Sequence, residues 1–250
     1  PCDRENYCNL NMRCLLVDTG DKRILIDTGT GDKQLQYLKY YGFQGVINFD
    51  AGLAEIGYKC TEITDVIFTH LHFDHCGGAT RYAANGKDIE LVFPNAVHWV
   101  SNSQWLNFLN PNVRESDSYF PENLLPVKEA GKLKLISENC FVCPEFEIRI
   151  FDGHTVGQLV SYINTGDTTL VYVGDVIPLA ANVPLSWISS YDIFPLKAME
   201  EKKILLDEAV EKNQILFFEH DAYTECCSVV ANGSKHKVAG TFRFDEIFKS

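Results

Sequence analysis

Residues 70–75 constrain this chain more than any other part of its sequence. Four of these six positions carry side chains that can bind a metal ion, namely His70, His72, Asp74 and His75. The preceding run, residues 65–69, is largely apolar and predicts a buried strand. Alternate residues of a strand point to the same face, so we expect the first two histidines to lie side by side.

A glycine pair follows this motif at residues 77–78. Glycine permits a sharp turn, which would bring Asp74 and His75 round toward the two histidines. Imidazole nitrogens and carboxylate oxygens are the ligands that zinc and its first-row neighbours prefer. A chance group of surface polar residues is the alternative, but the strand before the motif and the turn after it supply the context that a metal motif needs.

Three later segments extend the pattern. Residues 151–158 read Phe-Asp-Gly-His-Thr-Val-Gly-Gln, residues 171–175 form an apolar run that ends in Gly-Asp, and residues 216–221 form one that ends in Glu-His-Asp. With the first motif, these segments resemble the metallo-β-lactamase superfamily of metallohydrolases. The resemblance extends from Cys14 to about His220, and its nearest branch is that of the small-molecule lactonases and phosphotriesterases.

The resemblance implies a mixed α/β fold, the four-layer αβ/βα sandwich, with metals at an edge where strand ends converge. No repeat, low-complexity tract or linker interrupts the sequence. We therefore expect one domain over residues 1–250.

The resemblance also implies seven metal ligands. One ion would be held by His70, His72 and His154, the other by Asp74, His75 and His220, and Asp175 would bridge them. We expect two divalent ions, zinc first, with Mn²⁺ or Fe²⁺ as alternatives. Two cations that share a water molecule lower its pKa enough to give hydroxide near neutral pH, and Asp74 would carry the proton.

Aromatic residues suggest where a substrate binds. The stretch 98–126 mixes them with Asn, Ser and Pro, which favours a helix followed by a long ordered loop, not a strand. Such loops are often lids or binding loops, although aromatic side chains also fill cores. The substrate-binding candidates are Trp99, Trp105, Tyr119, Trp187 and Tyr191. They predict an apolar pocket wall, which favours a small, largely uncharged ester, lactone or phosphotriester.

Other functions stay open. Quorum-signal lactonases of this branch carry a Tyr shortly after the bridging Asp, and residues 176–180 contain none. A mononuclear iron dioxygenase acting on persulfides would use only His70, His154 and Asp175. A glyoxalase II-like thioesterase would need Lys or Arg for a charged glutathione. A non-enzymatic binding module would lack some of the metal ligands of the family pattern, and this sequence has all seven.

Composition limits the partners. Acidic residues outnumber basic ones by 34 to 22, giving a net charge of −12, and no basic cluster offers a nucleic-acid surface. No apolar run approaches the roughly 18–20 residues of a membrane helix. We therefore expect a small-molecule substrate, no nucleic acid and no membrane, and we leave a homodimer open.

Cysteine usage favours a cytoplasmic protein, because the count of nine is odd and leaves at least one free thiol. No signal peptide is visible in the polar opening residues. The chain does not begin with Met, so export stays open.

Hydrophobic periodicity predicts the main elements. Strands are expected at residues 13–18, 23–27, 65–69, 89–93, 146–150, 159–164, 169–173 and 215–218. Helices are expected at residues 33–41, 51–58 and 196–212. The two histidines outside the motifs are His98, which lies in the aromatic stretch, and His236, which we place at the surface.

Overall fold

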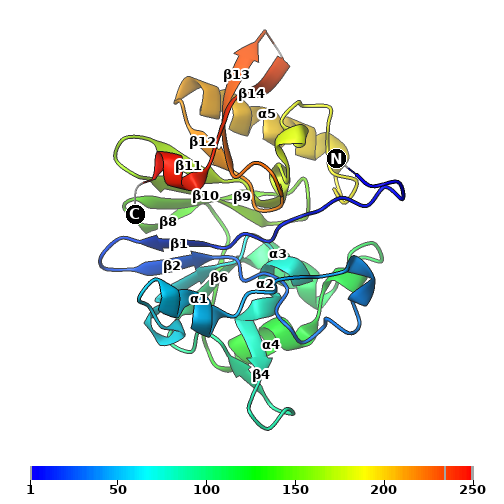
Figure 1. Cartoon of the computed structure of the whole chain (residues 1–250), viewed down its shortest axis with the longest axis vertical. Coiled ribbons are helices and arrows are strands. Elements are labelled where there is room, and N and C mark those ends of the chain that lie inside the picture. The colour runs from blue at the N-terminus through cyan, green and yellow to red at the C-terminus, as the bar shows by residue number, and fades with distance from the viewer. Residues whose placement is uncertain (1, 234, 249–250) are drawn as a thin grey trace. The chain divides into compact units, whose positions relative to one another are not determined.

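The structure is a computed structural model that describes residues 2–233 and 235–248. The chain divides into two compact units, which we call the first unit (Cys14–Ser137) and the second unit (Pro1–Arg13 with Glu138–Ser250). In Figure 1 the first unit runs from blue to green, and most of the second unit runs from green to red. The single domain expected from the sequence stays a prediction.

A five-stranded sheet forms the centre of the first unit, in the order β1-β2-β3-β6-β7. The strands are β1 (Leu15–Asp18), β2 (Arg23–Ile26), β3 (Asp65–Ile67), β6 (Val97–Ser101) and β7 (Leu133–Ile136). β1 and β2 are antiparallel, whereas β2, β3, β6 and β7 are parallel. The parallel strands end at one edge, where open α/β sheets bind ligands, and residues 68–75 follow β3 there.

Short helices complete the first unit. The α-helices are α1 (Phe49–Glu55), α2 (Phe73–Cys76), α3 (Asn102–Leu109) and α4 (Pro121–Glu129), and a small hairpin consists of β4 (Thr80–Tyr82) and β5 (Ile89–Leu91). Single 3₁₀ turns are η1 (Lys39–Tyr41), η2 (Cys60–Glu62), η3 (Gly77–Ala79) and η4 (Ser116–Ser118). Phe68, Phe93 and Val100 belong to the buried core of this unit.

The second unit is built on a seven-stranded sheet in the order β14-β13-β12-β11-β10-β9-β8. Its strands are β8 (Cys140–Cys143), β9 (Phe146–Phe151), β10 (Gln158–Asn164), β11 (Thr169–Tyr172), β12 (Ile215–Phe217), β13 (Cys226–Asn232) and β14 (Lys235–Phe242). Its helices are η5 (Gly174–Val176), η6 (Ala180–Asn182), α5 (Pro195–Glu211) and α6 (Phe244–Ile247).

Only β11 and β12 are parallel neighbours in this sheet. A parallel pair needs a crossover connection, and α5 lies in that connection and packs on the sheet (Figure 1). Leu205, Leu206 and Ala209 of α5 join the core cluster that contains Val171 of β11. Because β11 and β12 run the same way, the segments that follow them emerge at one edge.

The mixed α/β class predicted from the sequence is confirmed. Of the helices, 196–212 is found with nearly the expected bounds, and 51–58 begins slightly earlier, as α1. Residues 33–41 form turns and only one 3₁₀ turn. There the side chains of Lys33 and Gln34 bond to distant parts of the unit, which favours an irregular backbone over a helix.

Two local expectations are wrong. The stretch from residue 98 begins as β6, a strand paired on both sides with β3 and β7, because tertiary pairing outweighs composition in a central strand. His236, expected at the surface, is buried, and its Nε2 lies 2.8 Å from Oδ1 of Asp207. Among the described residues, no helix is long and apolar enough to cross a membrane.

Candidate metal centre

The metal motif of the first unit follows β3 directly. His72 precedes α2 in an extended conformation, so α2 begins only after the two neighbouring histidines have been placed. The glycine pair has a different purpose from the one expected. A Cβ at Gly77 would lie 2.0 Å from the Thr30 oxygen, and one at Gly78 would lie 2.2 Å from the Thr28 oxygen. Glycine is therefore required for close approach of two backbone segments, which fixes the exit of α2.

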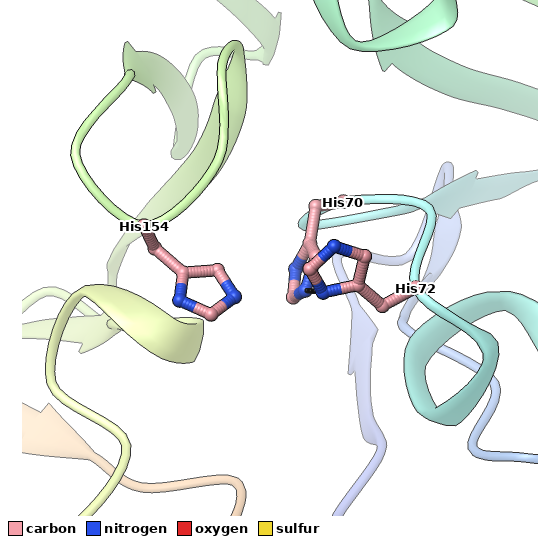
Figure 2. A group of neighbouring side chains, drawn as sticks. All are labelled: His70, His72 and His154. Atoms are coloured by element: carbon pink, nitrogen blue, oxygen red, sulfur yellow. Dashed lines mark hydrogen bonds between the residues drawn. The ribbon is translucent and has the colours of Figure 1, made fainter. Parts of the chain in front are cut away.

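His70 and His72 present two nitrogens to the same point. Nε2 of His70 lies 2.9 Å from Nδ1 of His72 (Figure 2). Two nitrogens bound to one tetrahedral zinc ion lie about 3.3 Å apart, given bonds of about 2.05 Å. The separation of the pair is near the one that two ligands of a single ion would have.

The other nitrogens of these two rings contact oxygen atoms. Nδ1 of His70 lies 3.1 Å from the Thr69 hydroxyl. Nε2 of His72 lies 3.2 Å from the buried carboxylate of Glu115. That carboxylate also accepts hydrogen bonds from Asn107 and from the Tyr119 hydroxyl. Contacts of this kind orient metal-binding imidazoles in proteins.

His75 is held by a buried aspartate. Its Nδ1 lies 3.0 Å from Oδ2 of Asp27, and the same carboxylate accepts the backbone N–H of Thr69 at 2.7 Å and its hydroxyl at 2.6 Å. Nε2 of His75 is left on the side of Asp74, 3.8 Å from its Oδ1. The side chain of Asp74 is 29% exposed, whereas that of His75 is fully buried.

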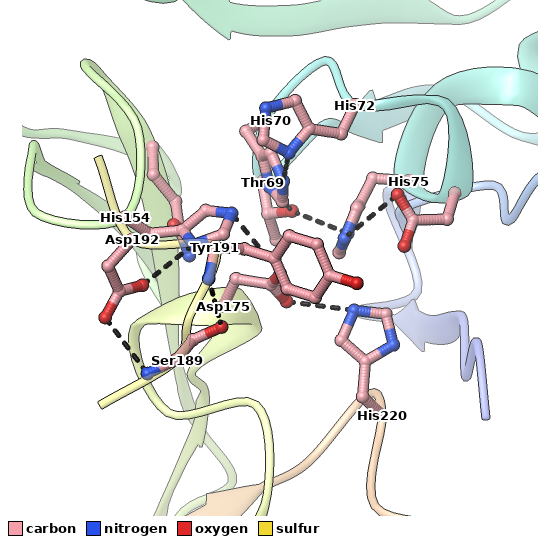
Figure 3. Close-up of polar contacts among 12 residues, drawn as sticks. Thr69, His70, His72, His75, His154, Asp175, Ser189, Tyr191, Asp192 and His220 are labelled. Carbon is pink, nitrogen blue, oxygen red and sulfur yellow. Dashed lines mark hydrogen bonds and ion pairs between the residues drawn. The ribbon is translucent and has the colours of Figure 1, made fainter. Parts of the chain in front are cut away.

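In the second unit, Asp175 lies between two histidines. Its Oδ2 is 3.3 Å from Nε2 of His154, and its Oδ1 is 2.9 Å from Nε2 of His220 (Figure 3). Each carboxylate oxygen thus contacts a different imidazole.

The remaining nitrogens of these rings also have partners. Nδ1 of His220 lies 2.7 Å from the backbone oxygen of Asn11. A carbonyl oxygen can only accept, so Nδ1 of His220 carries a proton. Nδ1 of His154 lies 3.0 Å from Oδ1 of Asp192 (Figure 3). Both rings therefore turn Nε2 toward Asp175.

A divalent cation fits this donor set. His220 and Asp175 place an imidazole nitrogen and a carboxylate oxygen 2.9 Å apart. The same ring nitrogens and carboxylate oxygens are zinc ligands by type. Of the seven predicted ligands, His70, His72, Asp74 and His75 lie in the first unit, and His154, Asp175 and His220 lie in the second.

The aromatic candidates divide into two groups. Trp99 is buried in β6, its indole donates to Asp65 at 2.8 Å, and Trp105 stacks on Phe108 in the core. Tyr119 is buried and supports Glu115. These three side chains are used for packing and hydrogen bonding within the first unit, and the expectation that they contact substrate stays a prediction.

Trp187 and Tyr191 differ from that group. Their side chains are 64% and 65% exposed, on the segment that joins Asp175 to α5. They stay candidates for substrate contact.

An aromatic surface of the first unit was not predicted. It consists of Tyr37, Tyr40, Tyr41, Phe43, Phe73 and Phe120, linked by ring contacts of 4.3–6.2 Å. Its three tyrosines are strongly exposed. Phe73 is the residue before Asp74, so this surface adjoins the metal motif. The sequence did not predict this surface because residues 33–41 were expected to form a helix.

Three carboxylates that orient imidazoles were also missed. Asp27 directly follows β2, and its place after a buried strand was a usable signal. Glu115 and Asp192 lie outside any regular helix or strand and belong to no motif. Only the three-dimensional contacts identify them.

The chain matches a known protein family. The family model described as the metallo-beta-lactamase superfamily matches residues 13–220. The chain is 25% identical over 240 residues to an N-acyl homoserine lactonase of Bacillus cereus, which covers 88% of this chain and 85% of the relative.

Two solved structures are similar. A probable metal-dependent hydrolase from Staphylococcus aureus has a TM-score of 0.86 and 25% identity, over 96% of this chain and 84% of that one. A dizinc quorum-quenching lactonase, solved with its product, has a TM-score of 0.77 and 24% identity, over 96% and 82%. The second likeness bears on the fold alone.

Proposed function

The chain belongs to the metallo-β-lactamase superfamily and is a metal-dependent hydrolase, and we propose that it uses two divalent metal ions to cleave a small, largely uncharged lactone, ester or phosphotriester. The fold and enzyme class expected from the motifs are confirmed by the family match. The number of ions and the substrate class are our proposal.

The observation that carries the proposal is the contact between Asp175 and His220. These side chains bring an imidazole nitrogen and a carboxylate oxygen, both zinc ligands by type, within 2.9 Å of each other, and Asn11 holds the other ring nitrogen. We propose that the seven residues hold the ions in the family's pattern: His70, His72 and His154 for one, Asp74, His75 and His220 for the other, and Asp175 for both.

Ions bound there would polarise the substrate oxygen and lower the pKa of water enough to supply hydroxide near neutral pH. Asp74 is the residue that we assign to proton transfer, because its carboxylate is 29% exposed beside a fully buried histidine. Asp27, Glu115 and Asp192 orient the imidazoles.

The substrate class rests on the surfaces near the ligands. The aromatic surface adjoins Asp74, and Trp187 and Tyr191 are exposed on the segment after Asp175. Such side chains suit an apolar substituent. The Bacillus cereus lactonase supports a lactone as the first choice. The absence of Tyr in residues 176–180 keeps the class broad.

A substrate panel tests this proposal. Protein reconstituted with Zn²⁺ or Mn²⁺ is assayed against lactones, aryl esters, phosphotriesters, glutathione thioesters and β-lactams, with the metal content measured on the same sample. We expect a neutral lactone or ester to be hydrolysed fastest. Asp175→Ala should abolish turnover, whereas Asp167→Ala, which removes an exposed carboxylate of the same unit, should not.

Faster hydrolysis of the glutathione thioester than of every neutral substrate would favour a glyoxalase II-like thioesterase. One bound iron ion per chain, together with oxidation of a persulfide, would favour the dioxygenase. Either result would overturn the proposal.

A further inference from the structure

The segment of residues 177–194, between η5 and α5, connects the three ligand candidates of the second unit. It begins just after Asp175. The backbone N–H of Ala180 donates to Oδ2 of Asp221, the neighbour of His220, at 2.9 Å. The other end of the segment contacts His154 in two places.

Those two contacts involve Asp192 and the next residue. Oδ1 of Asp192 lies 3.0 Å from Nδ1 of His154, and its Oδ2 accepts the backbone N–H of Ser189 at 3.2 Å. The backbone N–H of Ile193 donates to the carbonyl of His154 at 2.9 Å. The conformation of this segment thus decides where the carboxylate that orients His154 is placed.

One buried side chain holds the middle of the segment. Nζ of Lys202, on α5, donates to the backbone oxygens of Asn182 at 2.9 Å, Trp187 at 3.0 Å and Pro184 at 3.1 Å. An ammonium group has three N–H donors, and all three are used on this one turn. The residue is 1% exposed.

A lysine in this place is costly. Burial lowers the pKa of Lys202 to about 8, while the charge of Asp192 partly offsets the effect. A leucine or methionine would fill the same space without desolvating a charge. The chain nevertheless places a cation there, directed at the backbone of one segment.

We propose that Lys202 is a positioning residue of the metal centre, which fixes the turn at residues 182–187 and thereby holds Asp192 against His154. The same turn sets the place of Trp187, an exposed candidate for substrate contact. This inference rests on the proposed function only in taking His154 as a metal ligand.

A purely structural lysine is the alternative, and metal affinity separates the two. The test compares Lys202→Met with Lys203→Met, which removes a neighbouring, half-exposed lysine of α5 whose partner is Asp207. Amide hydrogen exchange of residues 179–194, zinc affinity by chelator competition, and KM and kcat are measured for both.

For Lys202→Met we expect at least 10-fold faster exchange confined to residues 179–194. We also expect zinc affinity to fall by about 10-fold, the lower range for loss of a residue that orients a ligand. KM should change more for bulky substrates than for small ones. Lys203→Met should match the unaltered protein in every readout.

Unchanged exchange in residues 179–194 would overturn the proposal, and so would faster exchange with unchanged zinc affinity, which would show a structural role only. If Lys202→Met does not fold, Lys202→Gln keeps one or two of the donors and should give intermediate values. The exchange and zinc measurements need no substrate, so they stand even if none of the proposed substrates is cleaved.

Discussion

Nε2 of His220 lies 2.9 Å from Oδ1 of Asp175, while the opposite nitrogen of the same ring is bonded to the backbone of Asn11. The residues that supply this contact are more than forty positions apart, and the sequence segment that fixes the ring is more than two hundred positions from it. The parallel pairing of β11 and β12 brings Asp175 and His220 together, because each follows one of these strands. The isolated bridge between Leu10 and Asp221 brings the segment that contains Asn11 beside His220.

Metal content is the first consequence of that contact. We expect the purified protein to carry close to two divalent ions per chain by elemental analysis. Removal of the ions by a chelator should lower the melting temperature, because ions that bind only the folded state stabilise it. At most one ion after reconstitution with zinc or manganese would contradict a dinuclear centre.

Asp27→Asn tests how His75 is held. Asp27 has a positive φ of 55°, which Asn tolerates, so the backbone should keep its conformation. Replacing one carboxylate oxygen with an amide disturbs the contact to His75, and we expect zinc affinity to fall by about 10- to 100-fold.

Chelator competition measures that affinity. Asp32→Asn is the matched control, because Asp32 is exposed in the turn that follows. Equal affinity in the two variants would show that Asp27 does not orient a ligand.

The metal motif was predictable because its chemistry is local. His70 and His72 are two residues apart, and a strand end places them side by side without help from the rest of the fold. The orienting carboxylates were not predictable in the same way. Glu115 reaches His72 across 43 positions and Asp192 reaches His154 across 38. No spacing rule links residues that only tertiary packing brings together.

The elements show the same limit. α5 was found because its apolar stripe is local and long, and its proline suits the first turn. β6 was missed because its strand character comes from β3 and β7 on either side. Trp99 was therefore assigned to a binding loop, although it is buried in the middle of that strand.

Gly77→Ala should disrupt the metal motif. The added Cβ would lie 2.0 Å from the backbone oxygen of Thr30. Because the clashing atom belongs to the backbone, relieving the clash requires one of the two backbone segments to move. We expect a loss of roughly 2–4 kcal/mol in the free energy of unfolding, in the range of overpacking and strain. Urea denaturation of the metal-free protein measures it.

Gly52→Ala is its control. Gly52 lies within α1, and the nearest atom to an added Cβ is 3.9 Å away. Alanine should stabilise the helix by about 0.5–1 kcal/mol. Equal destabilisation by both substitutions would show that the close approach at Gly77 is not the cause.

His98 should make stability depend on acid pH. It is buried and stacks on Phe68 with centroids 5.8 Å apart, and burial lowers its pKa from 6.5 to about 4. Between these values the unfolded chain binds a proton that the folded chain does not. This contribution to stability is therefore complete above about pH 6.5 and is lost as the pH falls toward 4.

The pKa shift corresponds to roughly 3 kcal/mol. His98→Leu should remove that part of the pH dependence between pH 4 and 6.5, measured by denaturation at several pH values. His236→Leu is the comparison, because His236 is also buried but bonds to Asp207. An unchanged slope in His98→Leu would contradict the assignment.

Tyr41→Ala tests whether the aromatic surface contacts substrate. Its ring is packed 5.5 Å from that of Phe73, the residue before Asp74. Removing it takes away apolar area that a substituent would cover, at about 25 cal/mol per Å². We expect KM to rise by about 5- to 10-fold for lactones with long acyl chains and to change little for unsubstituted ones, with metal content unchanged.

Tyr82→Ala is the control, since Tyr82 is a half-exposed tyrosine of β4 in the same unit. A similar rise in KM for both chain lengths, or for both variants, would show that the aromatic surface does not select the substrate.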